Sequence, residues 1–284
     1  MDLDVVSIGS CNMDIILRVP SFVEPDSEMY VEKIYMQPGG PAFNFAVNMA
    51  RLKFNTWIIA RIGMDRFGEI IKKTLKKEGV NIEYLQESEI PTGVAFISVD
   101  KKGRRSVYSY MGANATLDFS KKDIKRIKTA DVVYLSGTYW ETALKVSKRA
   151  NIFIYNPGSI IANFGTKTLS KIFKHTYILF ANEKELKKLT NLNIEKGARI
   201  LLDLGVKIVV ITRGKKDAIA ITENKIVRCP AKKLKVVDTT GAGDAFAAGF
   251  IAKWLKNENL KNCLRFGHQK AAQCIKNYGS MQLS

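Results

Sequence analysis

The residues best suited to chemistry lie together in one short segment, Asp238-Thr-Thr-Gly-Ala-Gly-Asp244. A strand over 235–237 is predicted to enter this segment, and a helix is predicted to follow it, starting near residue 243. The N–H groups of a small-residue turn and of a helix N-terminus favour phosphate binding, and this turn consists of Gly241, Ala242 and Gly243. Asp244 lies in the first helical turn, where its carboxylate is placed to accept the proton of a hydroxyl that attacks a phosphoryl group.

Two other interpretations of this segment compete with the catalytic one. In the first, the glycines only form a turn, and Asp244 only complements the dipole of the helix. In the second, Gly241 and Gly243 belong to a dinucleotide-binding fingerprint. The second interpretation fails, because Phe246 stands at the third glycine position and no strand with a terminal acidic residue follows about 20 residues later.

The elements that must position this segment alternate between strands and helices. Short apolar runs that end in a polar residue or a glycine predict strands over 5–9, 56–63, 131–137, 151–156, 176–181 and 207–212. Helical spacing of apolar residues predicts helices over 42–52, 65–78, 183–189 and 194–204. This alternation predicts an α/β fold with a doubly wound, mainly parallel sheet. Ligands bind such sheets at the carboxyl ends of the strands, so we expect the motifs there.

Two stretches, 15–36 and 92–110, break the alternation. Each is predicted to be a strand, a turn and a second strand, with no helix. Neither pair buries two faces alone, so we expect the two pairs to form a small antiparallel sheet beside the strand ends. Such a sheet serves as a lid, as a surface for dimer packing, or as both. With no internal repeat or linker, residues 1–284 are predicted to form one domain with this sheet as an appendage.

Composition limits the class of protein. The 284 residues carry 45 Lys plus Arg and 27 Asp plus Glu, a net charge of +18, which suits nucleic acid or anionic metabolites. The basic clusters are scattered over predicted helices and turns, so a solvated surface is favoured and no nucleic-acid partner is expected. No apolar run approaches the ~20 residues of a membrane span. The acidic N-terminus and four cysteines without a CxxC pair predict a cytoplasmic protein with reduced thiols.

The motifs taken together resemble the ribokinase family, also called the PfkB carbohydrate kinases. The segment 238–250 has every fixed position of the family's C-terminal signature, D-T-x-G-A-G-D-x-F-x-x-G-F. The N-terminal half is similar to the first signature, over 39–50 and 62–68. Shorter family features follow in the same order, and these are Thr92-Gly93, Gly112-Ala-Asn114, Asn182-Glu-Lys-Glu185 and Thr212-Arg-Gly214. The likeness covers nearly the whole chain, which makes it highly specific.

The resemblance implies a role for each matching residue of the phosphoryl-transfer site. Asp244 is the catalytic base, and the anion hole is formed by Gly241, Ala242 and Gly243. Asn182 and Glu185 help to place Mg²⁺ and the phosphates, Glu185 through water, although both also suit a plain helix N-terminus. The remaining matches contact the nucleotide, at Thr212 and Gly214, or hold a monovalent cation such as K⁺, at Asp238 and Thr240.

The resemblance places the acceptor site in the N-terminal half. Asp14 matches an aspartate that binds substrate hydroxyls, with turn capping as the alternative role. Gly40 and Asn44 match a close-approach glycine and a hydroxyl-binding amide. Ribokinases carry a lysine after the glycine pair where this chain has Pro41, so fructose-like sugars, sugar acids, sugar phosphates and nucleosides stay open beside ribose.

The prediction that follows is an ATP- and Mg²⁺-dependent kinase that phosphorylates a hydroxyl of a small sugar-like acceptor. A nucleoside kinase on the same fold is the alternative. A basic regulatory protein that kept the fold and lost catalysis is a rival from another class, and the intact Asp244 argues against it. The sequence lacks a Walker A motif and the protein-kinase motifs, so those classes are excluded. A homodimer through the lid sheet is expected from the resemblance.

Overall fold

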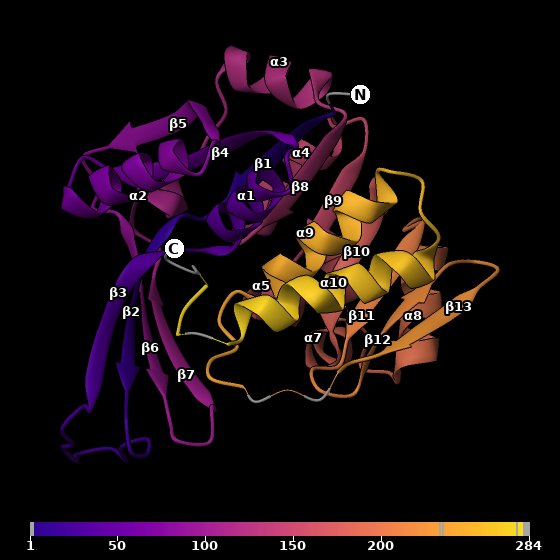
Figure 1. Cartoon of the computed structure of the whole chain (residues 1–284). Helices are drawn as coiled ribbons and strands as arrows, with labels where there is room; N and C mark the ends of the chain where they lie inside the picture. The colour runs from indigo at the N-terminus through magenta and orange to yellow at the C-terminus, as the bar shows by residue number, and fades with distance from the viewer. Residues whose placement is uncertain (1–2, 233, 235, 277, 281–284) are drawn as a thin grey trace.

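A nine-stranded sheet dominates the computed structural model, which describes residues 3–232, 234, 236–276 and 278–280 (Figure 1). In spatial order its strands are β13 (Ile226–Pro230), β12 (Asp217–Ile221), β11 (Ile208–Thr212), β10 (Thr176–Asn182), β9 (Phe153–Asn156), β8 (Val132–Ser136), β1 (Asp4–Gly9), β4 (Asn55–Gly63) and β5 (Asn81–Ser88). All neighbours from β11 to β5 are parallel, and β12 and β13 add an antiparallel edge. The predicted doubly wound, mainly parallel sheet is confirmed.

Helices cover both faces of this sheet. One face packs against α1 (Pro41–Arg51), α2 (Arg66–Lys77), α9 (Ala242–Trp254) and α10 (Leu260–Cys274). The other packs against α3 (Lys121–Thr129), α4 (Trp140–Ser147), α6 (Gly165–Phe173), α7 (Glu183–Thr190) and α8 (Ile194–Asp203). Short helical turns are η1 (Gly112–Thr116), α5 (Gly158–Ile161) and η2 (Ala162–Phe164). Alternate strand residues enter opposite cores, as Val133 and Tyr134 of β8 do, which is why these strands are apolar throughout.

A four-stranded lid sheet stands away from the large one (Figure 1). Its order is β3 (Lys33–Gly39), β2 (Asn12–Arg18), β6 (Gly93–Val99) and β7 (Arg105–Tyr110). The two predicted antiparallel pairs, β2 with β3 and β6 with β7, are present, and they join through a parallel pairing of β2 with β6. The first pair starts three residues earlier than predicted, at residue 12, and the second starts one residue later, at 93. A long connection over 19–32 separates β2 from β3.

The lid has an inner and an outer face, because side chains alternate along each strand. The strand register puts Asp14, Gln37 and Ala95 in one row of the inner face. The outer face carries a group of exposed apolar side chains, Ile34, Met36, Phe96, Tyr108 and Tyr110. The aromatic residues of β6 and β7 therefore point away from the side of the lid that carries Asp14.

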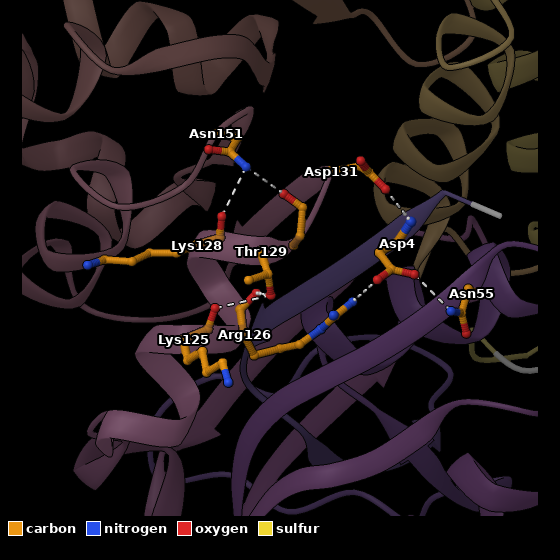
Figure 2. A network of polar contacts seen from close by, with 9 residues as sticks. Asp4, Asn55, Lys125, Arg126, Lys128, Thr129, Asp131 and Asn151 are labelled. Atoms are coloured by element: carbon orange, nitrogen blue, oxygen red, sulfur yellow. Dashed lines mark hydrogen bonds and ion pairs between the residues drawn. The ribbon is translucent and has the colours of Figure 1, made fainter. Parts of the chain in front are cut away.

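The amino edge of the large sheet, where its parallel strands begin, is held by a polar network (Figure 2). The Asp4 carboxylate forms an ion pair of 2.7 Å with Arg126 and accepts a hydrogen bond of 2.8 Å from Asn55. The Asp4 N–H donates to the Asp131 carboxylate at 2.8 Å. The Arg126 guanidinium also lies over the Trp57 ring, 3.7 Å from its centroid. These contacts fasten α3 and the loop before β8 to the start of the sheet.

Most predicted elements appear within two residues of their expected bounds. The first lid pair extends three residues beyond its expected bounds at each end, and one predicted strand does not form. No strand forms over 236–237, and residue 235 lies outside the described residues. The Val237 N–H instead donates to the carbonyl of Ile275 at the end of α10, so this segment is bonded to α10 where it enters the 238–241 turn. Within the described chain, no helix combines the length and apolar character that crossing a membrane requires.

Candidate active site

The predicted acceptor and phosphoryl-transfer residues meet at the carboxyl edge of the large sheet. The Asn44 side-chain amide on α1 donates a hydrogen bond of 3.0 Å to the Asp244 carboxylate on α9, across 200 residues of sequence. Asn44 is 5% exposed and Asp244 is 8% exposed. Helix α1 follows β3 of the lid, and α9 follows the 238–241 turn, so this bond joins the two signatures of the chain.

Asp244 has the electrostatic character of a proton acceptor. Burial raises its pKa to about 7, with a further contribution from the negative charge of Glu185. The Asn44 hydrogen bond and the charge of Arg105 oppose this rise. A carboxyl group with a pKa near neutrality exchanges protons efficiently at physiological pH, so the position and the environment of Asp244 both suit a general base.

The turn before α9 has the backbone of an anion site. Gly241 is the N-cap of α9 with φ of +74°, a left-handed conformation that favours glycine. A Cβ on Gly241 would lie 2.4 Å from that of Ser280, so the C-terminal segment packs against this turn. A Cβ on Gly243 would meet no atom within 4 Å, so the helix N-terminus faces open space there. The predicted Gly241-Ala242-Gly243 turn therefore offers N–H groups to an anion.

Asp14 lies on the inner face of β2, only 3% exposed, and it does not cap a turn. Burial, together with the negative charges of Asp244 and Asp238, raises its pKa to about 7. A Cβ on Gly39 would come within 2.0 Å of the Asp14 carboxylate, so the glycine gives this side chain its room. Gly40 is the N-cap of α1 with φ of +95°, where a Cβ would clash with the carbonyl of Ser10.

Asp238 and Thr240 form a buried hydrogen-bonded cluster beside the Gly241-Ala242-Gly243 turn. The fully buried Asp238 carboxylate accepts hydrogen bonds from the Thr240 N–H and hydroxyl and from the Gly279 N–H, at 2.8–2.9 Å. The Thr240 hydroxyl also accepts a bond of 3.1 Å from Arg105, which begins β7 of the lid. The catalytic turn is thereby tied to the lid and to the C-terminal segment.

The predicted nucleotide residues lie at the same edge, at the ends of β10 and β11, where Asn182 and Thr212 are register partners. Asn182 and Glu185 form a capping box on α7, so the structural role foreseen for them is present. The Glu185 carboxylate also accepts a bond from Ser159 at 3.0 Å. Gly214 adopts φ of +59° and a Cβ there would meet open space. No contact joins Thr212 or Gly214 to the catalytic carboxylates within the described residues.

Several polar groups around the site escaped the sequence analysis. Gln37, 5% exposed, lies beside Asp14 on the lid, and Thr138, 6% exposed, follows β8. Within the described chain, no hydrogen-bond partner exists for four buried atoms, Gln37 Nε2, Asn44 Oδ1, Thr138 Oγ1 and Ser280 Oγ. Buried polar groups are normally paired, so these atoms are available to a ligand. The alternation of inner and outer residues along the lid strands is the sequence signal that could have placed Gln37 on the inner face with Asp14.

Comparison with known proteins gives consistent matches over the full length. The family model described as pfkB family carbohydrate kinase matches residues 2–284. The ATP-dependent ribose-1-phosphate kinase of Halopiger xanaduensis is 30% identical over 269 residues, covering 93% of this chain and 89% of that protein. A nucleoside kinase of Methanocaldococcus jannaschii is 28% identical over 283 residues, covering 97% and 91%.

The fold also matches a solved structure with its ligands. The ribokinase of Arabidopsis thaliana, complexed with ribose and ATP, superposes with a TM-score of 0.87 at 26% identity. The match covers 99% of this chain and 96% of that protein. The lid and the large sheet are thus both part of the shared architecture.

Proposed function

Since this chain belongs to the pfkB family of carbohydrate kinases, we propose that it transfers the γ-phosphoryl group of ATP to a hydroxyl of a small sugar-like acceptor. The observation that carries the proposal is the 3.0 Å bond between Asn44 and Asp244. It brings the hydroxyl-binding half of the site to the carboxylate beside the anion turn. An acceptor hydroxyl between these groups lies within reach of the proton acceptor.

In the proposed reaction, Asp244 removes the proton of the acceptor hydroxyl as its oxygen attacks the phosphorus of the transferred group. Asn44 holds the carboxylate in place through its amide. The N–H groups at the start of α9 stabilise negative charge on the transferred group, which is commonly the largest catalytic contribution. Asp14 and the unpaired Asn44 Oδ1 orient the acceptor by accepting bonds from its hydroxyls.

The nucleotide is proposed to lie along the ends of β10 and β11, against Thr212 and Gly214. Glu185 suits Mg²⁺, because it is a buried carboxylate that, among the described residues, accepts hydrogen bonds from Asn182 N and Ser159 Oγ and keeps oxygen lone pairs free for further contacts. Bound Mg²⁺ neutralises phosphate charge and keeps most of its waters, which fits this sparse set of ligands. The binding of a monovalent cation such as K⁺ by Asp238 and Thr240 stays a prediction.

An acceptor panel tests the proposal directly. ADP release from ATP and Mg²⁺ is measured with ribose, fructose, 2-keto-3-deoxygluconate, ribose 1-phosphate, adenosine, cytidine and inosine. Turnover of a sugar that disappears in Asp244→Asn supports the proposal. Turnover confined to the nucleosides would establish the alternative of a nucleoside kinase, which the similarity to the M. jannaschii enzyme favours as the second candidate. Nucleotide binding without turnover of any acceptor would contradict the proposal.

We also infer that two copies associate through the outer face of the lid. Phe96, Met36 and Tyr108 lie in register across three strands and are 45%, 55% and 75% exposed. A continuous apolar sheet face of this kind is usually covered by a partner. Light scattering after size exclusion tests the inference: a dimer that becomes a monomer in Tyr108→Glu supports it, and a wild-type monomer at micromolar concentration contradicts it.

A further inference from the structure

Arg105 reaches from the lid into the site. The residue begins β7, on the same inner face as Asp14, and its Nη1 donates a hydrogen bond of 3.1 Å to the Thr240 hydroxyl. The turn before it also lies against this region, because a Cβ on Gly103 would be 3.9 Å from the Val237 carbonyl. The tip of the β6–β7 hairpin therefore rests on the segment that leads into the catalytic turn.

The guanidinium of Arg105 has unused binding capacity. Within the described chain, no carboxylate lies within ion-pairing distance of it, and its one hydrogen bond goes to a neutral hydroxyl. A guanidinium offers five N–H donors in a planar fork that fits carboxylates and phosphates. Neighbouring arginines differ: Arg104 pairs with Asp100 at 2.7 Å, and Arg18 pairs with Glu32 at 2.9 Å. Arg105 is thus a cation at the site without an anion of its own.

The positive charge of Arg105 acts on the carboxylates of both Asp14 and Asp244. It lowers the pKa of Asp14 and of Asp244, against the much larger raising effect of burial. The site therefore lies within electrostatic reach of this guanidinium. A second unused donor, Gln37 Nε2, lies on the same inner face, in the row of Asp14. The Gln37 side chain is 5% exposed and packs against Gly279.

We propose that Arg105 binds an anionic group of the acceptor, so that the substrate is a sugar carrying a phosphate monoester or a carboxylate. This inference rests on the proposed function and narrows its acceptor. One end of the substrate presents the attacking hydroxyl to Asp244, and the other presents its anion to Arg105. Arg105 is exposed, so water solvates its guanidinium in the free protein. A neutral sugar forms no ion pair with it, whereas an anionic one gains an ion pair that offsets its repulsion by Asp14, Asp238 and Asp244.

The position of Arg105 favours the acceptor over the nucleotide as its partner. It shares the inner face of the lid with Asp14 and Gln37, while Thr212 and Gly214 follow β11 of the large sheet. Phosphate and carboxylate present the same pair of oxygens to the guanidinium fork. The experiment therefore includes both chemistries and tests them against otherwise identical neutral compounds.

The test compares matched acceptors. Ribose 1-phosphate is paired with ribose, and 2-keto-3-deoxygluconate is paired with its methyl ester, so that each pair differs by one anionic group. We expect wild-type kcat/KM to favour one anionic member by about 100-fold, since a charge-assisted hydrogen bond of ~3 kcal/mol gives this ratio. Whichever anionic compound is preferred identifies the group as phosphate or carboxylate. Equal kcat/KM within both pairs would overturn the proposal.

Variants of Arg105 test whether this residue causes the preference for anionic acceptors. In Arg105→Met, kcat/KM for the preferred anionic acceptor is expected to fall at least tenfold further than that for its neutral partner, mainly through KM. Arg105→Lys should recover part of the loss. Arg104→Met removes the same charge next to it and should leave the preference intact. An equal loss on anionic and neutral acceptors would overturn the proposal and would assign Arg105 to the transferred phosphoryl group instead.

Direct binding separates this inference from the proposed function. Calorimetric titration of the same acceptors into wild type, Asp244→Asn and Arg105→Met needs no turnover. Tight binding of an anionic compound that is weakened only in Arg105→Met supports the inference even where no acceptor is phosphorylated, in which case the proposed function alone has failed. Failure of both anionic compounds to bind more tightly than their neutral partners overturns the inference, whatever the activity.

Discussion

Acidic residues at the two edges of the large sheet differ in their burial and in whether they have a cationic partner. At the amino edge, Asp4 has a cation at 2.7 Å and an amide donor at 2.8 Å (Figure 2). At the carboxyl edge, Asp14, Asp238 and Asp244 are all more than nine-tenths buried. None of these three has an ion-pair partner within 4 Å in the described part of the chain. The same residue type thus has a cationic partner at one edge and only neutral hydrogen-bond donors, or none, at the other.

This difference separates stability from function along the length of the same strands. Burial without a counter-ion is unfavourable and raises the pKa of a carboxyl group, as it does for Asp14 and Asp244. Such unpaired groups persist where chemistry uses them. The orphan amide and hydroxyl atoms of Gln37, Asn44 and Thr138 lie around the same edge. The polar groups at the carboxyl edge therefore remain available to a ligand, whereas those at the amino edge bond to one another and stabilise the fold.

The largest expected effect is the loss of catalysis in Asp244→Asn. The amide keeps the shape of the side chain but cannot accept the proton, so kcat is expected to fall about 1000-fold. ATP binding, followed by calorimetry, should be retained. The matched change at the other edge, Asp4→Asn, should leave kcat within about twofold, because Asp4 only holds the scaffold. A wild-type rate in Asp244→Asn would show that another group is the base.

The second effect concerns stability against pH. Asp14 has a pKa of about 7 in the folded protein and an ordinary value of 3.8. Ionisation of this buried carboxyl therefore lowers the unfolding free energy. This destabilisation is absent well below pH 4, grows from pH 4 to 7 and is complete above pH 7. At about 1.4 kcal/mol for each pH unit, the full penalty approaches ~4 kcal/mol. We expect Asp14→Asn to recover about half of it, raising the unfolding free energy by about 2 kcal/mol at pH 8 and by much less at pH 4. Urea titrations at both pH values measure this. Destabilisation at pH 8 would contradict the assignment of a charged, unpaired Asp14.

A smaller effect is expected on the pH dependence of kcat. Asp244 must be ionised to accept a proton, so kcat should decline about tenfold for each unit below a pH of about 7. The Asn44 hydrogen bond holds the pKa of Asp244 down, so Asn44→Ala should move this limb to higher pH by about one unit. Asn48→Ala, one turn along α1, is the control, because its amide bonds only to the Asn44 carbonyl. An unmoved limb in Asn44→Ala would mean that the limb reports a different group.

The smallest effect lies at the amino edge. Asp4→Asn removes the partner of Arg126, whose side chain is 12% exposed, and we expect a loss of about 1 kcal/mol of unfolding free energy. Chemical denaturation measures it, with Glu24→Gln in the exposed lid connection as the control for a change of charge alone. Should Asp4→Asn cost activity instead of stability, the division between the edges would be wrong.

Much of the fold and part of the site follow from local sequence. The apolar runs of β1, β8, β10 and β11 and the spacing of α1 and α2 are strong periodic signals, and the order of the elements follows from them. The 238–244 segment identified both Asp244 and the anion turn, because small residues before a helix have few other uses. The strands β5, β12 and β13 were missed. β5 and β13 lie at the two edges of the sheet, where the apolar pattern is weaker, and β12 is only five residues long.

Tertiary structure decided what the local signals could not. The residue types and their spacing determined the α/β class and predicted a proton acceptor and a phosphate turn, because backbone N–H groups and periodic burial are local properties of the chain. Only folding brought Asn44 to Asp244, Gly279 to Asp238 and Arg105 to Thr240. Hydrogen-bonded pairs separated by 41 to 200 residues depend on how whole elements cross. For the same reason, burial set the pKa values of Asp14 and Asp244, and the lid brought Arg105 beside the 238–241 turn.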